Sequence, residues 1–367
     1  MNIFDYLILL LFLSFFISLL IPNKTASRKF FVVSSVILLV IVQGLRADHI
    51  GTDLPVYKIQ YNSIQFQPFN RIATYWGFEF GYNFLVWSLS KIGISFQVFL
   101  ITVSIFFNVI FGKFLYRFSP NILLSLILYL FFGIYDFGFS GIRQIIAMGL
   151  VLQSTHYIYD KKKYPFLILI LLATSIHKVS IIFLPLYFLI NNSLLNKYYL
   201  KAFPLIFIVN LLFVKLFSFR ILNLLSIDIA YYNSTFHFGA NELILLGIVI
   251  IFCVSYLINR NQLFNNSINN IFLVIFTITL LIQSYGIYSY MFSRLNLFTY
   301  QYLCVFVPIL FKLIFSENST SKSTYYNSIV LLRVTLSFFI ICTIAIMCHI
   351  LLLRAPHGIL PYSFFWN

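Results

Sequence analysis

The chain has 367 residues, of which 61% are hydrophobic, 20% aromatic and only 9% charged, and its formal net charge is +15. A composition this apolar excludes a soluble globular protein and a disordered one, and it indicates a chain that crosses a membrane many times. The positive excess is typical of cytoplasmic membrane loops, so we expect no nucleic-acid partner.

Apolar runs that cross or nearly cross a bilayer recur from end to end of the chain. They predict an all-α polytopic integral membrane protein with about 12 transmembrane helices, and we treat 1–367 as a single transmembrane domain. The expected spans are Ile3–Ile21, Phe30–Gln43, Phe96–Phe111, Ile122–Ile134, Ile142–Tyr157, Tyr164–Ser175, Val179–Ile190, Ala202–Phe217, Leu243–Ile258, Ile271–Gln283, Leu295–Phe311 and Ile329–Leu352. A run at 81–92 reaches only about 18 Å as a helix, so we predict that it is interfacial or half-inserted.

The basic residues predict how these spans are oriented. One alternation of loops carries Lys24, Arg28, Lys29, Lys113, Arg117, Lys161, Lys162, Lys163, Lys197, Lys201, Arg260, Lys312 and Lys322. We expect that side to be the cytoplasm of a multi-pass protein in the cytoplasmic (inner) membrane. Both termini then lie outside, and the outer loops 44–80 and 218–242 are expected to contribute to an extracytoplasmic cavity that holds the active site.

The loop after the second span combines charged and turn-forming residues. It contains Arg46 and then Gly51-Thr52-Asp53, a turn after which Pro55 is placed to begin a short helix that includes Tyr57. Thr52 or Asp53 can cap that helix. The alternative is that Arg46 and Asp53 project into the outer cavity.

A second polar group lies where two apolar runs meet, near residue 140. Asp136 and Arg143 are seven residues apart, and an unpaired charge in lipid costs on the order of 3 kcal/mol, so both are expected to face protein or water. We predict that Ser140 caps the next helix, which puts Arg143 and Gln144 in its first turn. A cation there opposes the helix dipole unless an anionic ligand binds between them. The alternative is an ion pair between Arg143 and Asp136.

His177 and Lys178 interrupt a stretch that would otherwise be continuously hydrophobic. Such a pair is rare in lipid and therefore indicates a functional position. His177 could act as a general base or bind phosphate, since imidazole titrates near neutral pH. The alternative is an interfacial histidine beside a lysine that extends to the lipid headgroups.

Further arginines mark the outer ends of other spans. Arg294 opens a span from the outside as Arg143 does, and arginine grips phosphate oxygens with paired hydrogen bonds. Arg220 lies in the outer loop 218–242, whereas Arg354 and Tyr362 lie in the C-terminal tail. The histidines are dispersed and the acids form no metal-binding pattern, so we expect no metal and no cofactor.

In their order along the chain, these residues resemble the EpsG-type polysaccharide polymerases, which are similar in function to the Wzy polymerases of O-antigen and capsule. The resemblance covers roughly 46–362 and rests on Arg46 with Gly51-Thr52-Asp53 and Tyr57, Glu79-Phe80-Gly81-Tyr82, Ile142-Arg143-Gln144 with Ala147, His177-Lys178, Arg294 and Pro361-Tyr362. Each motif is short, and their ordered set is the specific signal.

The resemblance implies a metal-independent membrane glycosyltransferase that transfers a growing glycan from an undecaprenyl-diphosphate carrier to a new lipid-linked repeat unit. The candidate bases for the acceptor hydroxyl are His177, Asp53 and Glu79. The residues expected to bind substrate are Arg46, Tyr57, Asp136, Arg143, Gln144, Lys178, Arg220, Arg294, Arg354 and Tyr362.

The partners implied are the undecaprenyl-diphosphate-linked oligosaccharide donor and acceptor, membrane lipids, and a chain-length regulator or flippase. Two alternative functions stay open. One is a membrane O-acyltransferase that acts on a glycan and centres on His177, and the other is a lipid-linked-glycan flippase.

Overall fold

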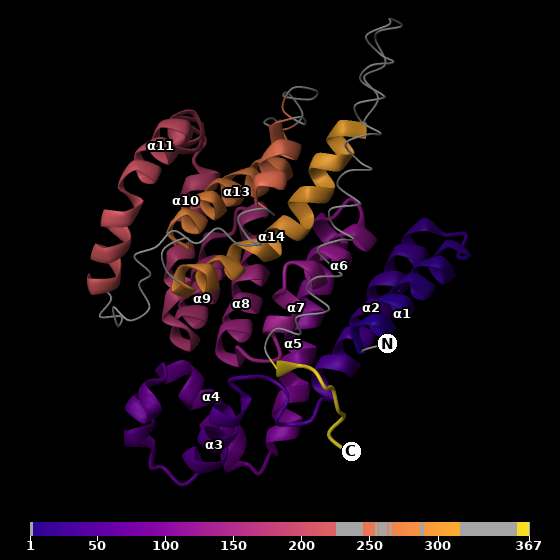
Figure 1. The fold of residues 1–367 in the computed structure, drawn as a ribbon, viewed down its shortest axis with the longest axis vertical. Coiled ribbons are helices and arrows are strands. Elements are labelled where there is room, and N and C mark those ends of the chain that lie inside the picture. The colour runs from indigo at the N-terminus through magenta and orange to yellow at the C-terminus, as the bar shows by residue number, and fades with distance from the viewer. Residues whose placement is uncertain are drawn as a thin grey trace, which may run out of the picture. The chain divides into compact units, whose positions relative to one another are not determined.

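The computed structural model describes residues 3–224, 245–253, 266–286, 290–315 and 358–366, together with Tyr256 and Leu263. Every regular element in these ranges is a helix, and they contain one isolated β-bridge between Arg46 and Phe364 (Figure 1). The all-α prediction is confirmed for this part of the chain.

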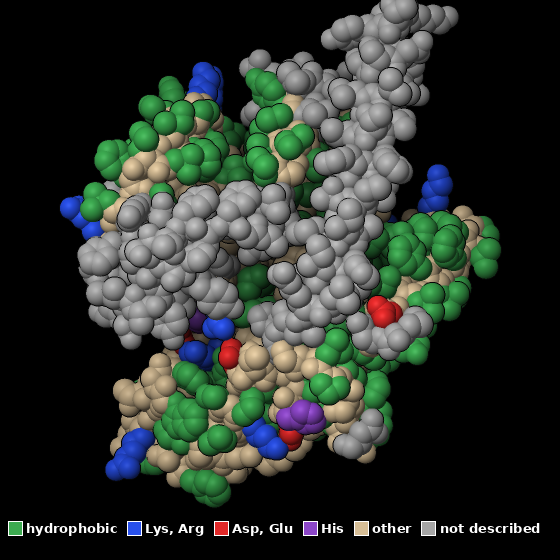
Figure 2. Space-filling model, in the orientation of Figure 1, with side chains coloured by type: hydrophobic (Ala, Val, Ile, Leu, Met, Phe, Trp, Pro, Cys, Tyr) green, Lys and Arg blue, Asp and Glu red, His purple; other side chains and the backbone are tan. Residues whose placement is uncertain are grey.

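Within the described residues, five helices are long and apolar enough to cross a membrane, which indicates a membrane protein. They are α2 (Lys24–Gly44), α5 (Phe96–Phe118), α11 (Ser193–Leu224), α13 (Ser267–Gly286) and α14 (Tyr290–Phe315). Shorter apolar helices include α1 (Ile3–Leu19), α6 (Ile122–Phe131) and α9 (Lys163–Ile176). Figure 2 shows hydrophobic side chains over much of the helix surface. The expected number of about 12 spans is not confirmed, and the span expected at Ile329–Leu352 lies outside the described residues.

Two of the expected spans are broken by residues that do not continue a helix. The span expected at 122–134 ends early because Gly133 adopts a left-handed conformation (φ 68°), after which α7 (Ile134–Phe137) forms a single turn. The span expected at 179–190 consists instead of a 3-10 segment, η2 (Lys178–Phe183), and the short α10 (Leu186–Asn191). Pro185 separates them, and proline has no backbone N–H to continue a helix.

The chain divides into two compact units. Unit 1 contains Met1–Phe118, Tyr129–Tyr187 and His349–Asn367, and unit 2 contains Ser119–Leu128 and Phe188–Cys348. A single transmembrane domain over 1–367 stays a prediction.

In unit 1, helices that are close in sequence pack against one another. Helix α2 packs on α1 and α5, while α8 (Ile142–Tyr159) packs on α5 and α9. The segment expected to be the outer loop 44–80 contains two helices, α3 (Leu54–Ile64) and η1 (Phe69–Gly77), and α4 (Phe80–Lys91) follows them. Helix α4 contacts α9 (Figure 1). The helix expected at 81–92 is therefore present as α4.

A buried polar network stabilises the centre of unit 1. Asn108 Nδ2 donates a hydrogen bond to Gln43 Oε1 at 2.8 Å, and Gln43 Nε2 donates to the Tyr135 carbonyl oxygen at 3.1 Å. The Tyr129 hydroxyl donates to Asn108 Oδ1 at 3.1 Å. Buried polar groups need such partners in an apolar interior, so this network specifies how α2, α5 and α7 meet.

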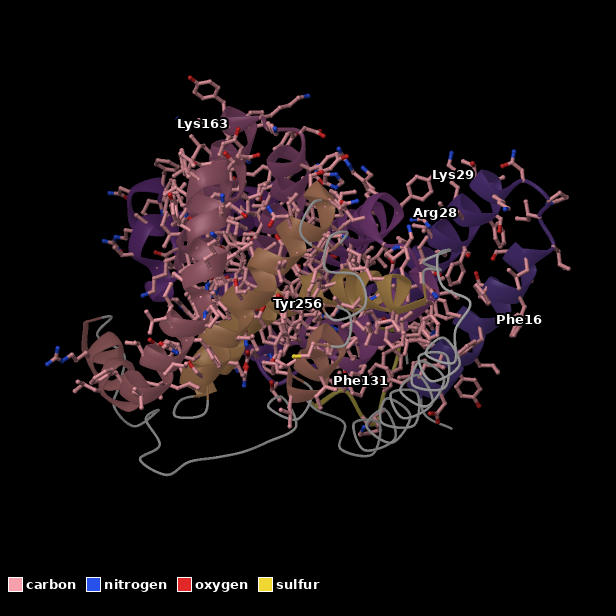
Figure 3. All side chains as sticks on the ribbon, turned by 90° about the horizontal axis from the view of Figure 1, so that it is seen from above. Phe16, Arg28, Lys29, Phe131, Lys163 and Tyr256 are labelled. Atoms are coloured by element: carbon pink, nitrogen blue, oxygen red, sulfur yellow. The ribbon has the colours of Figure 1, made fainter. Side chains whose placement is uncertain are left out.

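One end of unit 1 contains loops that were predicted, from their basic residues, to lie on the cytoplasmic side of the membrane. Arg28 Nη2 donates to the Tyr116 carbonyl oxygen at 2.8 Å, and Arg117 forms an ion pair with Asp160. Figure 3 shows Arg28 and Lys29 at the first turns of α2. The N-terminus of α2 and the C-terminus of α5 therefore share this end.

The opposite end of unit 1 carries the other set of loops. Gln97 Nε2, near the start of α5, donates to the Gly44 carbonyl oxygen at the end of α2 at 2.9 Å. The segments 45–95, 136–143 and 175–180 are joined at this end by the contacts described below. The predicted grouping of these loops agrees with the structure, and their placement outside the membrane stays a prediction.

Unit 2 is built on α13, which packs against α11 and α14. The Tyr199 and Thr277 hydroxyls are 2.9 Å apart, and Asn210 Nδ2 donates to Ser284 Oγ at 2.6 Å. Because the two contacts follow the same order along both helices, α11 and α13 run parallel.

Candidate functional site

Glu79 joins three segments of unit 1. Its Oε2 accepts a hydrogen bond from Arg143 Nη1 at 2.6 Å, and its Oε1 accepts one from the backbone N–H of Lys178 at 3.1 Å. His177 Nδ1 lies 3.5 Å from the same Oε1. The start of α4, the first turn of α8 and the break after α9 therefore meet at one carboxylate. We call the group around it the Glu79 cluster: Tyr57, Phe78, Glu79, Tyr82, Arg143, His177 and Lys178.

Asn83 holds the segment that precedes Glu79. It is fully buried in α4, and its Nδ2 donates to the carbonyl oxygens of Ile72 and Tyr75, both at 2.9 Å. Its Oδ1 accepts from Gln60 Nε2 at 3.0 Å. One amide therefore ties α3, η1 and α4 together, and this fixes the backbone from which the Glu79 side chain extends.

Gly81 allows α4 to approach the end of α9. A Cβ atom at this position would overlap Ser175 Oγ and would lie 2.6 Å from the Ser175 carbonyl oxygen. Because α4 approaches so closely, Glu79 reaches the break after α9. There the N–H of His177 still bonds to the Ala173 carbonyl oxygen at 2.8 Å, while the N–H of Lys178 turns to Glu79.

Burial and hydrogen bonding act in opposite directions on the Glu79 carboxyl. Burial alone would raise its pKa, but the nearby His177 ring, the hydrogen bond from the Lys178 N–H and the charge of Arg143 together lower the pKa to about 2. The side chain is 16% exposed. Glu79 is therefore ionised at neutral pH and is a weak base, so the geometry favours it as the group that orients Arg143 and His177.

Arg143 lies in the first turn of α8, as predicted, and its partner is Glu79 rather than Asp136. The alternative of an ion pair between Arg143 and Asp136 is wrong, because Asp136 is buried in the short turn of α7, where burial raises its pKa to about 7. The Arg143 guanidinium lies 3.8 Å from the centre of the Phe78 ring, and its Nε donates to the Tyr57 hydroxyl at 3.4 Å.

One edge of Arg143 is still available to a ligand. Its Nη2 has no hydrogen bond to any residue that the structure describes, and the side chain is 21% exposed. A guanidinium that is held by Glu79 on one edge and by Phe78 on one face presents its other edge in a fixed direction.

Ser140 and Asp53 act differently from the capping prediction. The N-cap of α8 is Gly141, and Ser140 Oγ instead lies 2.8 Å from Thr52 Oγ1 and accepts the Asp53 N–H at 3.0 Å. Asp53 is the N-cap residue of α3, as predicted, but its side chain makes no capping hydrogen bond to that helix. The reason is tertiary, because Gly51 (φ 126°) packs directly on the segment before Ser140 and brings the turn there.

Arg46 and Tyr362 form an enclosed group apart from this cluster. Arg46 is 2% exposed and donates to the carbonyl oxygens of Gln43 and, at 3.3 Å, Phe139. Burial lowers its pKa to about 10. The Tyr362 hydroxyl donates to the Val42 carbonyl oxygen at 2.7 Å. These contacts attach 358–366 to the end of α2 and favour a structural role for both residues over contact with a diphosphate.

The other predicted site residues lie elsewhere. Gln144 is buried in the first turn of α8. Arg220 belongs to α11 rather than to the outer loop 218–242, because that helix continues to Leu224. Arg294 lies in α14. Both Arg220 and Arg294 belong to unit 2, whereas the Glu79 cluster belongs to unit 1. Arg354 lies outside the described residues.

Two residues of this site, Phe78 and Asn83, were missed by the sequence reasoning, and Tyr82 was named only in the family resemblance. Phe78 and Tyr82 surround the Arg143 guanidinium, with the Tyr82 ring centre 5.9 Å away, and Asn83 holds the backbone. The Tyr82 hydroxyl is buried and has no hydrogen-bond partner among the described residues. The available signal was the placement of aromatic residues on both sides of Glu79, one of them a helical turn away.

The sequence is similar to one known protein family. The sequence matches the EpsG family over residues 29–364, which includes the whole Glu79 cluster. No curated protein and no solved structure matches the chain. In the described part of the chain, no group of three or more His, Cys, Asp or Glu residues could hold a metal ion.

Proposed function

Because the chain belongs to the EpsG family, we propose that it is a membrane glycosyltransferase that polymerises lipid-linked oligosaccharide repeat units into a surface polysaccharide. The donor carries the growing glycan on undecaprenyl diphosphate, and the acceptor is a single lipid-linked repeat unit. The reaction takes place at the outer face of the cytoplasmic membrane. A flippase that delivers the repeat units and a chain-length regulator are the expected partners.

The observation that carries this proposal is the Glu79 cluster. A leaving diphosphate needs cationic donors, and the cluster offers the open edge of Arg143 and the exposed ammonium of Lys178. With His177 neutral, the two cations exceed the one carboxylate by a single positive charge. The cluster therefore attracts an anion even though Glu79 is ionised.

The reaction forms one bond, breaks another and transfers one proton. The acceptor hydroxyl oxygen attacks the anomeric carbon of the donor sugar, a new glycosidic bond forms, and the bond from that carbon to the carrier diphosphate breaks. The electron pair leaves with the diphosphate, whose charge Arg143 stabilises. The hydroxyl proton passes to a base, and His177 is the residue that we assign to it.

Glu79 suits His177 to this task. When Nδ1 carries the hydrogen and faces the Glu79 carboxylate, the lone pair of Nε2 is left to accept a proton, as in other pairs of a carboxylate and a histidine. The carboxylate also stabilises the imidazolium that forms. Asp53 remains the second candidate for the base, because Ser140 links its backbone to the segment just before Arg143.

The test is the fate of repeat units in a host that lacks this protein. We expect polymer to disappear and single lipid-linked repeats to accumulate in the outer leaflet, where an impermeant glycosidase reaches them. Restoring the wild-type protein should restore polymer. Repeats that accumulate only on the cytoplasmic side would indicate a flippase, and a full-length polymer that lacks acyl groups would indicate an O-acyltransferase.

A further inference from the structure

Unit 2 contains a large cavity that the proposed reaction does not use. Its volume is about 1170 Å³, and it lies between α11, the helical residues 245–253 with Tyr256, and α13. Small-molecule pockets typically hold roughly 300–1,000 Å³, so this cavity is large enough for a lipid. Most of its wall is apolar, and Phe207 and Leu280 are the lining residues farthest along α11 and α13 from the N-termini of these helices.

Polar groups gather at one end of this cavity. Asn196 and Lys197 lie in the first two turns of α11, and Asn270 lies in the first turn of α13. Since α11 and α13 run parallel, the positive ends of both helix dipoles point to this same end of the cavity. Two helix N-termini and a lysine form a local environment that favours an anion.

Asn196 provides an independent sign that a ligand binds there. It is 8% exposed, it lines the cavity, and its Nδ2 has no hydrogen-bond partner among the described residues. A buried amide donor without a partner is costly, and a ligand oxygen would satisfy it.

The lysines at this end have no acidic neighbour in the described part of unit 2. Lys197 and Lys201 are four residues apart, and both line the cavity. The described residues of unit 2 contain no Asp or Glu at all. No carboxylate in this part of the protein therefore neutralises the positive charge of these lysines.

We propose that the cavity binds an anionic phospholipid. The headgroup phosphate lies at the polar end, near Asn196, Lys197 and Lys201, and the acyl chains lie along the apolar wall toward Phe207 and Leu280. Basic pockets between membrane helices take lipid headgroups in this manner. The predicted cytoplasmic position of Lys197 and Lys201 separates this site from the carrier diphosphate, which we expect on the outer side. The inference does not rest on the proposed function.

Binding of a defined lipid to the purified full-length protein tests the inference. In detergent, phosphatidylglycerol should raise the melting temperature and remain bound in native mass spectra, whereas phosphatidylcholine should do neither. Each lysine near a phosphate is worth about 1 kcal/mol, so Lys197→Gln with Lys201→Gln should weaken phosphatidylglycerol binding about 30-fold. Lys24→Gln with Lys29→Gln removes two exposed lysines of unit 1 and should leave binding unchanged.

A second variant separates the headgroup from the acyl chains. Leu280→Trp should reduce lipid binding by filling the apolar part while both lysines remain. If inorganic phosphate stabilises the protein as strongly as the lipid does, the site is an anion site alone and the proposal is overturned. Equal phosphatidylglycerol binding by the double lysine variant and the wild type would also overturn it, as would preferential retention of the polyprenyl carrier.

Discussion

Among single side chains, Glu79 connects the segments of the candidate site because its two oxygens accept hydrogen bonds from different segments. Oε2 binds the Arg143 side chain and Oε1 binds the Lys178 backbone. Arg143 is further held against Phe78 and near Tyr57. A guanidinium confined on so many sides loses little freedom when an anion binds, so its direction and not only its charge should matter.

Replacing Arg143 tests whether direction matters. We expect Arg143→Lys to reduce polymer synthesis about 10²-fold or more, nearly as much as Arg143→Ala, because an ammonium cannot bind Glu79 and a phosphate with the same planar fork. Polymer length and amount would be measured at matched protein levels. We expect the same pattern for Arg294, which lies in the early turns of α14. Full polymer from both Lys variants would contradict the expectation that Arg143 and Arg294 bind the carrier diphosphate.

His177→Gln tests the base. Glutamine keeps a hydrogen-bonding side chain but cannot accept the proton, so turnover should fall roughly 10²–10⁴-fold while lipid-linked substrate still binds. His177→Lys or His177→Arg should stay inactive too. Retained activity in either cationic variant would instead indicate that His177 binds phosphate. Normal polymerisation by His177→Gln would indicate that Asp53, and not His177, is the base.

The stability of the unaltered protein as a function of pH tests the state of Glu79. Its pKa is lowered to about 2, so the carboxylate should stay ionised, and its contacts should persist, between pH 5 and 8. A carboxyl with a lowered pKa stabilises the fold at pH values above its pKa in the unfolded chain, and this contribution is lost only as the pH falls toward 2. Circular dichroism and the melting temperature would be measured from pH 8 downward, and a loss of stability that is complete by pH 5 would contradict the Glu79 assignment.

At the level of helices, the site depends on how closely α4 approaches α9. Gly81 makes this approach possible, because any Cβ would meet the backbone of Ser175. Asn83 fixes the other side of α4 to η1 and α3. Glu79 therefore sits at the N-terminus of a helix that is held on two sides, and this explains how it bonds to a backbone N–H 99 residues later in the chain.

Gly81→Ala should disturb this contact. The new methyl group cannot be accommodated by side-chain rotation alone, since it meets a carbonyl oxygen, and we expect a loss of about 1–3 kcal/mol in stability together with reduced polymer. Thermal unfolding in detergent would measure the loss. Gly247→Ala is the matched control, because its Cβ would meet no atom within 4 Å and should change little. Equal melting temperatures for the two variants would contradict the packing argument.

For the molecule as a whole, the two ends of unit 1 carry different chemistry. Arg28, Arg117 and Asp160 lie at one end, and the Glu79 cluster lies at the other. Basic residues concentrate on the cytoplasmic side of membrane proteins, which predicts that the Glu79 cluster faces outside.

Cysteine labelling in intact cells tests this orientation. A cysteine at position 53 or 178 should react with an impermeant maleimide, whereas one at position 162 should react only after permeabilisation. The unaltered protein, whose Cys253 is exposed and Cys304 buried, sets the background. Labelling of position 162 alone in intact cells would reverse the assignment.

The sequence by itself determined the class of the protein, the family and the end of unit 1 at which each loop lies. Hydrophobic runs and basic loops are local properties, and they follow from how each segment meets lipid or water. The helical start at Arg143 and the break at His177 were likewise predictable from neighbouring residues. The interruptions of two expected spans were not, because Gly133 and Pro185 break runs that are apolar on average. The number of about 12 spans stays a prediction.

Only the tertiary structure decided which groups meet. Arg143 had one nearby acid in sequence, Asp136, yet it pairs with Glu79, which is 64 residues away. Ser140 left the helix that it was expected to cap and bonded to the 52–53 turn, and Arg46 became enclosed rather than available to substrate. The physical reason is that a charge or a hydroxyl binds the partner that packing brings within about 3 Å, and sequence distance does not limit that choice once glycines such as Gly51 and Gly81 let the backbones touch.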